Sequence, residues 1–209
     1  MNAGLDVRPS SIAGQWYTAD PKRLAESIDQ YLQAAVLPDL NGEVVGVMAP
    51  HAGHKYSGAV AGYAFATLRN LQPEVLAVIS PILYPYTQRL LTSAHSAYQT
   101  PLGIIEIDHQ LLQALDQKLQ DQVGINLAAV RNDPEHSLEI ELPFLQRALT
   151  APFKLLPLMV REHNPEIVRG LGLALAEILR DRNSLLVAST DLSHFYSQRV
   201  AEGLDQAVL

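Results

Sequence analysis

The hexapeptide VLAVIS, residues 75–80, decides the fold class, because it is apolar up to its last residue and is followed by Pro81. A run of this kind is typical of a parallel strand that is buried on both faces. VVGVMA, residues 44–49, has the same character and is followed by Pro50. Between the two runs, residues 57–71 carry apolar side chains at helical spacing. This region therefore predicts a strand, a helix and a second strand.

The alternation continues toward the carboxyl end. Further strands are expected at residues 104–107, 154–159 and 184–188, further helices at residues 109–120, 165–179 and 198–209, and a loop-rich stretch at residues 82–103. Asp133-Pro134 indicates another helix start, and Pro143 is expected to kink or restart that helix. The pattern predicts one α/β domain, residues 1–209, with a mostly parallel central sheet and helices on both faces.

The composition argues against several classes of protein. The 209 residues carry a formal net charge of −7, which disfavours binding to nucleic acid or to an anionic membrane surface. The lack of cysteine excludes disulfides, thiolate nucleophiles and cysteine-held iron–sulfur clusters. There is no run of about 20 apolar residues that would predict a membrane span, and the first residues lack the apolar core of a signal peptide. We expect a soluble cytoplasmic protein.

Histidines and an aspartate follow two of the expected strands, at the edge where open α/β sheets bind ligands. His51 and His54 follow the first strand, and Asp191 and His194 follow the last one. Imidazole and carboxylate groups can bind a metal, or act as a base and the group that orients it. Each residue also has an ordinary interpretation, since loop histidines are often solvated and Asp191 can cap the next helix. We expect His51, Asp191 and His194 to share one cleft.

Glu135, His136 and Glu139 form a third polar cluster. Acidic residues favour a helix N-terminus through the helix dipole, so a structural role is open for them beside a place in the cleft. Other catalytic signatures are absent. The chain has no G-x-G-x-x-G or Walker motif for nucleotide phosphates, no G-x-S-x-G elbow and no H-E-x-x-H zinc signature.

Several motifs, taken in order, resemble the MEMO family, whose prokaryotic members are called AmmeMemoRadiSam system protein B. The matching segments are Arg8-Pro9, AGQWY at residues 13–17, PHAGHKYSG at residues 50–58, TPLG at residues 100–103, EHSLEIELPFL at residues 135–145 and STDLSH at residues 189–194. The motifs extend over almost the whole chain, and their combination is specific.

The resemblance implies a fold like that of the LigB-type class III extradiol dioxygenases, which hold non-haem iron at the edge of the sheet. It also implies a metal-binding pocket and a radical-SAM partner. His51, Asp191 and His194 fall on histidine and aspartate positions of the family motifs. Leu83 stands where the family has a pocket histidine, and His54 stands where tyrosine is usual. The family's carboxyl-terminal cysteine has no counterpart, and the chain is short at that end relative to the family.

These features lead to two hypotheses. The first, which we favour because of Leu83 and the missing cysteine, is a MEMO-like protein that is non-catalytic or binds iron, copper or zinc weakly. The alternative is a metal-dependent oxidoreductase of the non-haem iron type, similar to a dioxygenase, with His194 and Asp191 as catalytic residues. The expected metal ligands are His51 and His194. The expected binding residues of the cleft are His51, His54, His136 and Glu139.

The expected helix at residues 198–209 has an apolar stripe that includes Val200, Leu204 and Val208. A helix this short is marginal alone in water, so we expect it to dock on another subunit or to fray. Burial of each such side chain contributes roughly 1.5–3 kcal/mol, which favours a homo-oligomer.

Light scattering should therefore show a smaller species for Leu204→Glu than for the native chain, with Glu202→Gln as control. A monomer in all three proteins would contradict the oligomer.

Overall fold

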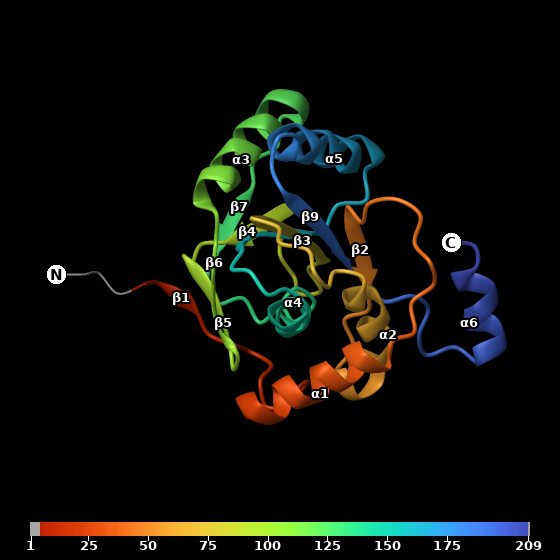
Figure 1. Ribbon diagram of the computed structural model, residues 1–209. Coiled ribbons are helices and arrows are strands. Elements are labelled where there is room, and N and C mark those ends of the chain that lie inside the picture. Colours follow the sequence, from red (N-terminus) through yellow and green to blue (C-terminus); the bar gives the residue numbers. More distant parts are fainter. Residues whose placement is uncertain (1–4, 209) are drawn as a thin grey trace.

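The structure, a computed structural model, describes residues 5–208 and contains a central six-stranded sheet between two layers of helices (Figure 1). The strand order is β2-β9-β3-β8-β4-β7. The strands are β2 (Gly46–Ala49), β3 (Val75–Pro81), β4 (Leu90–Ser93), β7 (Ala128–Val130), β8 (Lys154–Val160) and β9 (Ser184–Ser189). The first four strands in this order are parallel, whereas β4 pairs antiparallel with β8 and carries β7 parallel to itself. The mixed α/β architecture expected from the sequence is confirmed.

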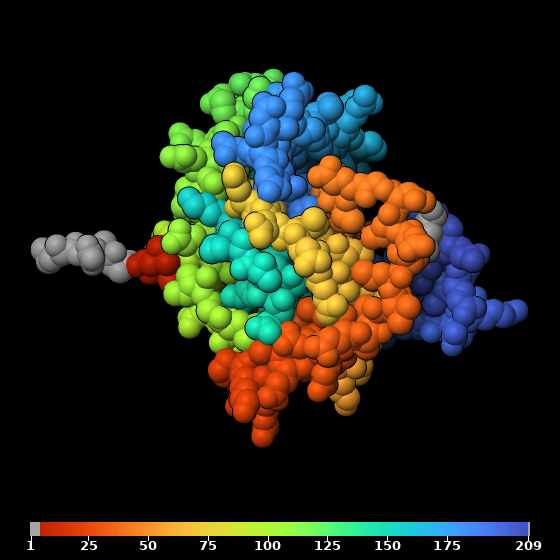
Figure 2. Space-filling view, viewed as in Figure 1, coloured from red at the N-terminus to blue at the C-terminus, as the bar shows by residue number. Residues whose placement is uncertain are grey.

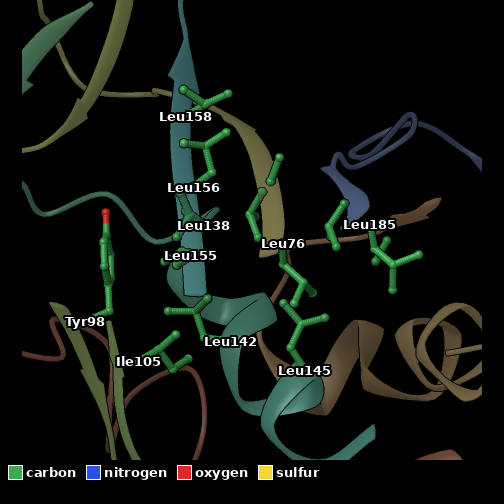
Figure 3. Packing of buried hydrophobic residues seen from close by; sticks show 14 of the residues in the cluster. Leu76, Tyr98, Ile105, Leu138, Leu142, Leu145, Leu155, Leu156, Leu158 and Leu185 are labelled. Carbon is green, nitrogen blue, oxygen red and sulfur yellow. The ribbon is translucent and has the colours of Figure 1, made fainter. Parts of the chain in front are cut away.

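Helices cover both faces of this sheet. α3 (His109–Val123) and α5 (Pro165–Leu179) lie on one face, and α1 (Pro21–Ala34), α2 (His54–Ala66) and α4 (Leu142–Ala148) lie on the other (Figure 1). Leucines of β3 and β8 pack against leucines of α4 in the core, and Figure 3 shows Leu76, Leu142 and Leu145 in this layer. β3 and β8 are therefore buried from both sides, as their composition predicted. The expectation of a buried strand was wrong for β2, an edge strand in which Met48 is 49% exposed.

A second, three-stranded sheet corrects the prediction of a loop-rich stretch at residues 82–103. It contains β1 (Val7–Arg8), β5 (Ala97–Thr100) and β6 (Gly103–Glu106), with β5 in the middle. Residues 82–103 thus contribute β4 and β5 to the two sheets. Each of these strands is only four residues long and mostly buried, so neither gives a long periodic pattern in the sequence.

The helix expected to start at Asp133 is absent, and this prediction was wrong. The chain passes from β7 through residues 131–138 without regular structure and then forms a short 3-10 helix, η1 (Glu139–Glu141). The Asp133 carboxylate receives hydrogen bonds from the buried Arg8 guanidinium at 3.0 Å, so it serves an ion pair instead of capping a helix. Pro143 lies in the first turn of α4, where a proline can restart a helix as expected.

The last helix, α6 (Gln198–Asp205), lies at one side of the molecule, outside the layers (Figures 1 and 2). It buries none of its residues, and Val200, Leu204 and Val208 are 42%, 44% and 70% exposed. The expected helix extended to Leu209, which lies outside the described residues. Docking of this apolar stripe on another subunit stays a prediction. Among residues 5–208, no helix combines the length and apolar character needed to cross a bilayer.

The packing of α2 against α1 depends on a close approach at Gly62. A Cβ atom at this position would lie 2.7 Å from the carbonyl oxygen of Tyr31, whereas a Cβ atom at Gly172 in α5 would have no neighbour within 4 Å. Gly62→Ala is therefore expected to lower the free energy of unfolding by about 1–3 kcal/mol. Gly172→Ala should raise it by about 0.5–1 kcal/mol, because alanine is the better helix former. Urea unfolding of both variants measures the difference, and equal stability of the two would contradict the close approach.

Candidate functional site

His51 lies at the carboxyl end of β2, beside the carboxyl end of β9. The two strands pair with Ala49 opposite Ser189, so the residues that follow them meet at this edge of the sheet. The His51 backbone N–H donates to Asp191 Oδ1 at 2.8 Å, and His51 Nε2 lies 3.8 Å from Asp191 Oδ2. His51 Nδ1 lies 3.1 Å from Ser189 Oγ. The structure thus brings His51 and Asp191 together, as the sequence predicted.

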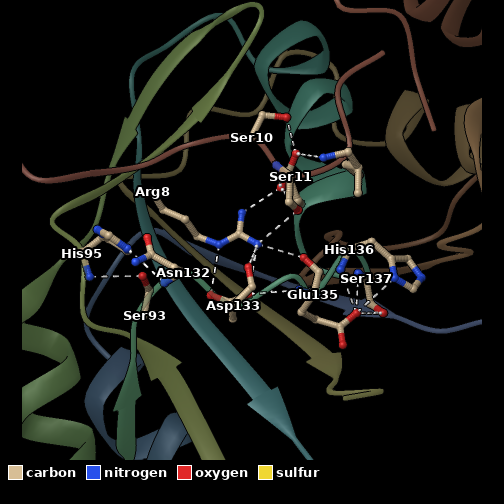
Figure 4. Close-up of polar contacts among 12 residues, drawn as sticks. Arg8, Ser10, Ser11, Ser93, His95, Asn132, Asp133, Glu135, His136 and Ser137 are labelled. Carbon is tan, nitrogen blue, oxygen red and sulfur yellow. Dashed lines mark hydrogen bonds and ion pairs between the residues drawn. The ribbon is translucent and has the colours of Figure 1, made fainter. Parts of the chain in front are cut away.

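His136 joins this group from residues 131–138. Its ring centroid is 5.8 Å from that of His51, at 76° between the planes, and 4.0 Å from that of Trp16. Its Nδ1 lies 3.4 Å from Glu135 Oε1, and Figure 4 shows the two side chains beside Ser137. Two imidazoles and the Asp191 carboxylate therefore form the centre of the candidate site.

Glu135 connects His136 to the loop after β3. Its Oε1 accepts hydrogen bonds from the backbone N–H groups of His136 and Ser137 and from the Ser137 hydroxyl, at 2.7–2.9 Å. Its Oε2 accepts the Leu83 backbone N–H at 2.6 Å. The Leu83 side chain is 61% exposed, so this residue contributes its backbone to the site. The sequence places Glu135 in a polar cluster that also suits a helix N-terminus, and its spacing does not single Glu135 out as a site residue.

The site contains imidazole nitrogens and carboxylate oxygens that can accept hydrogen bonds, and the carboxylates give it negative charge. Burial lowers the pKa of His51, which the Asp191 and Glu135 carboxylates only partly offset, and burial likewise lowers the pKa of His136. Both imidazoles are therefore neutral at pH 7. Burial opposes ionisation of Glu135, but the N–H donors of Leu83 and Ser137 outweigh it and lower its pKa. Within residues 5–208, neither the Glu135 nor the Asp191 carboxylate forms an ion pair with lysine or arginine. Such a site favours a positively charged ligand.

Two of the expected site residues have structural roles instead. His54 is buried, its ring contacts those of Tyr17 and Phe144, and burial lowers its pKa to about 4. Glu139 is fully buried and accepts hydrogen bonds from Arg8, Tyr17 and the serines 10 and 11. Both were expected in the cleft because short spacing along the chain was taken for proximity in space. Their side chains instead pack between α2, η1 and the amino-terminal segment.

His194 lies near this edge of the sheet, but its contacts differ from those expected of a metal ligand. It is exposed, its Nδ1 lies 3.0 Å from the Leu192 carbonyl oxygen and its ring contacts Phe195. After burial, which is the largest cause, proximity of His194 also lowers the pKa of His51. The structure thus places His194 beside the site, while the polar contacts of His51 go to Ser189 and Asp191.

A resident metal held by three protein ligands does not fit these side chains. Among residues 5–208, no group of three or more histidine, aspartate or glutamate side chains is arranged to hold a metal ion. The family resemblance implies a histidine at position 83, and the leucine found there offers no side-chain donor. The donor set at the edge of the sheet is two imidazoles with one carboxylate nearby, which leaves most of an ion's coordination to water.

Glu141, which the sequence did not single out, is a buried acid beneath the site. It is 1% exposed, and its Oε1 has no hydrogen-bond partner within the described chain. Burial raises the pKa of Glu141 well above its usual range, contact with Ser189 partly opposes this, and the Asp191 carboxylate adds to it. The folded protein therefore favours the protonated form of this side chain. The one signal in the sequence is an acidic residue between the apolar neighbours Ile140 and Leu142.

The raised pKa of Glu141 predicts a pH-dependent stability. Above a pH of about 4.3 the unfolded chain ionises this residue while the folded chain keeps it protonated, so folding loses stability as the pH rises. Glu141→Gln removes the effect. The free energy of unfolding of the native chain should fall relative to that of the variant by up to about 1.4 kcal/mol per pH unit between pH 5 and 7. Urea unfolding at several pH values tests this, and parallel profiles would contradict it.

Comparisons with known proteins agree with the family resemblance of the sequence motifs. Residues 8–209 match the family described as Memo-like protein. A MEMO1 family protein of Nitrosopumilus maritimus is 29% identical, and one of Methanopyrus kandleri is 33% identical; each alignment covers 97% of this chain and 74% of the relative. A MEMO1 family protein of Saccharomyces cerevisiae is 30% identical over 91% of this chain and 60% of its own length. The match extends over nearly the whole chain, and the protein therefore belongs to the MEMO family.

Proposed function

We propose that this MEMO family protein binds a divalent transition-metal cation weakly and reversibly at the carboxyl edge of its sheet. The observation that carries the proposal is that two neutral imidazoles, His51 and His136, lie beside the Asp191 carboxylate. In the described chain, neither Asp191 nor Glu135 forms an ion pair with lysine or arginine. Imidazole nitrogen suits zinc, copper, iron and nickel. Neutral histidines can bind a cation without first losing a proton.

The spacing of the two rings supports this function. Two imidazoles that bind one ion through nitrogen at about 2.0–2.1 Å have ring centroids roughly 5 Å apart. The centroids of His51 and His136 are 5.8 Å apart, which is close to that separation. The Asp191 carboxylate beside His51 adds negative charge near the ion. Water would complete the coordination, which makes the bound ion exchangeable.

The alternative is an oxidoreductase that keeps a catalytic metal. That chemistry needs protein ligands which fix the geometry of the metal and hold it through turnover. The geometry supports a labile site better, because Leu83 adds no ligand and His194 lies exposed with its Nδ1 against a backbone carbonyl. We therefore favour cation binding without a resident redox metal.

Metal analysis and titration test the proposal. Protein purified without chelator or affinity metal should contain well below one equivalent of iron, copper or zinc after dialysis. Calorimetric titration with Zn²⁺ or Co²⁺ should then show one site. His51→Ala and His136→Ala should each weaken binding at least tenfold, because each removes one of two imidazole ligands. His109→Ala, at an exposed histidine that begins α3, is the matched control and should bind like the native chain.

Two outcomes would overturn the proposal in different ways. Stoichiometric metal that survives dialysis would favour the oxidoreductase instead. No binding by the native chain, or equal binding by native and His51→Ala proteins, would exclude a cation site at this edge.

A further inference from the structure

We infer that Ser189 and Glu135 are positioning residues which hold His51 and His136 as the tautomers protonated on Nδ1, so that both Nε2 atoms carry the lone pair. The inference rests on the proposed function in one respect, since it names the nitrogen of each ring that would take the cation. The tautomers themselves are properties of the protein without any cation and can be measured in that state.

For His51, the argument starts from the Ser137 carbonyl oxygen, which can only accept. Ser189 Oγ lies 2.5 Å from it and donates its single proton there. A hydrogen bond from Ser189 to the nearby Glu141 carboxyl would likewise direct this proton away from His51. Ser189 therefore presents a lone pair to His51 Nδ1 at 3.1 Å, and Nδ1 must carry the proton. His51 and Ser189 are buried, so two opposed lone pairs there would be costly.

For His136, the partner of Nδ1 is a carboxylate. Both Glu135 oxygens accept hydrogen bonds from N–H or O–H groups, Oε2 from Leu83 and Oε1 from His136 and Ser137, so the carboxylate acts as an acceptor. Its Oε1 lies 3.4 Å from His136 Nδ1 and is held in place by three further donors from His136 and Ser137. His136 Nδ1 thus faces an acceptor at 3.4 Å, which favours a proton on Nδ1 and leaves Nε2 unprotonated.

Both rings then have Nδ1 beside an acceptor and Nε2 without a proton, as in metal-binding histidines, where one nitrogen faces an acceptor and the other binds the ion. In His51 the free nitrogen is the one that lies 3.8 Å from Asp191 Oδ2. Ser189 donates its proton to the Ser137 carbonyl and therefore accepts the proton of His51 Nδ1. Glu135 faces His136 Nδ1 itself. Neither positioning residue needs to touch the cation.

His54 provides a contrast three residues after His51. Its Nε2 lies 3.3 Å from the carbonyl oxygen of Ile140, which can only accept, so Nε2 carries the proton. Its Nδ1 is buried and has no hydrogen-bond partner in the described chain. The two histidines of the HAGH segment are therefore opposite tautomers, and one spectrum can record both.

The experiment is nitrogen-15 NMR of protein labelled at histidine, without added metal, at pH 7.5, where long-range couplings distinguish the two ring nitrogens. His51 and His136 should be protonated on Nδ1, and His54 on Nε2. Ser189→Ala should shift the tautomer ratio of His51 toward Nε2 by roughly fivefold, as expected for the loss of one hydrogen bond. Ser189→Thr restores the hydroxyl and should restore the ratio, while the His54 signals stay unchanged.

The native spectrum alone can overturn the inference, whatever the variants do. His51 or His136 protonated on Nε2 would refute it, and so would an unchanged His51 ratio in folded Ser189→Ala. In a Zn²⁺ titration, Ser189→Ala should also bind about 10–100-fold more weakly than the native chain. If the tautomers are as stated but the native chain binds no cation, the positioning roles stand and the proposed function fails.

Discussion

The Arg8 guanidinium is the group on which the site depends, because it fixes the chain that brings His136 to His51. It donates to the Asp133 carboxylate, to the backbone carbonyls of Asp133 and Glu135, and to Glu139, at 2.7–3.0 Å (Figure 4). This irregular segment lacks the hydrogen bonds of a helix or strand, so Arg8 supplies partners for carbonyl groups that would otherwise be orphaned. Arg8 is 1% exposed. Loss of its charge would leave two buried carboxylates uncompensated, which costs about 3–5 kcal/mol for a broken pair.

Local patterns in the sequence predicted several elements that are long or strongly apolar. The helix at residues 165–179 has the bounds expected, and the strand that begins at Val75 differs by one residue. The sequence analysis missed α1, although this helix is 14 residues long. Another failure lies where a distant partner decides the local structure. The sequence around Asp133 has the pattern of a helix N-terminus. In the structure the Asp133 carboxylate instead accepts hydrogen bonds from Arg8, which is 125 residues away in the chain. Nothing in the spacing around either residue could reveal that pair.

The candidate site could be predicted in part, for the same reason. The rule that ligands bind beyond the strand ends located His51 and Asp191, since it depends only on where buried strands stop. It could not tell that His54 turns into the core, because this depends on the aromatic rings of Tyr17 and Phe144. Ser189, the last residue of β9, was not among the expected site residues. Its hydroxyl instead lies between a carbonyl oxygen and an imidazole that come from two other segments.

The contact between α6 and the loop before it has a consequence for local motion. Asp205 Oδ1 accepts the Ser193 backbone N–H at 2.8 Å, while α6 itself buries no side chain. β9, by contrast, is paired on both sides, with β2 and β3. Stability therefore falls steeply within about ten residues of chain after Ser189. The loop that carries His194 can open as a small unit of its own, and its amide protons would exchange with solvent while those of β9 stay protected.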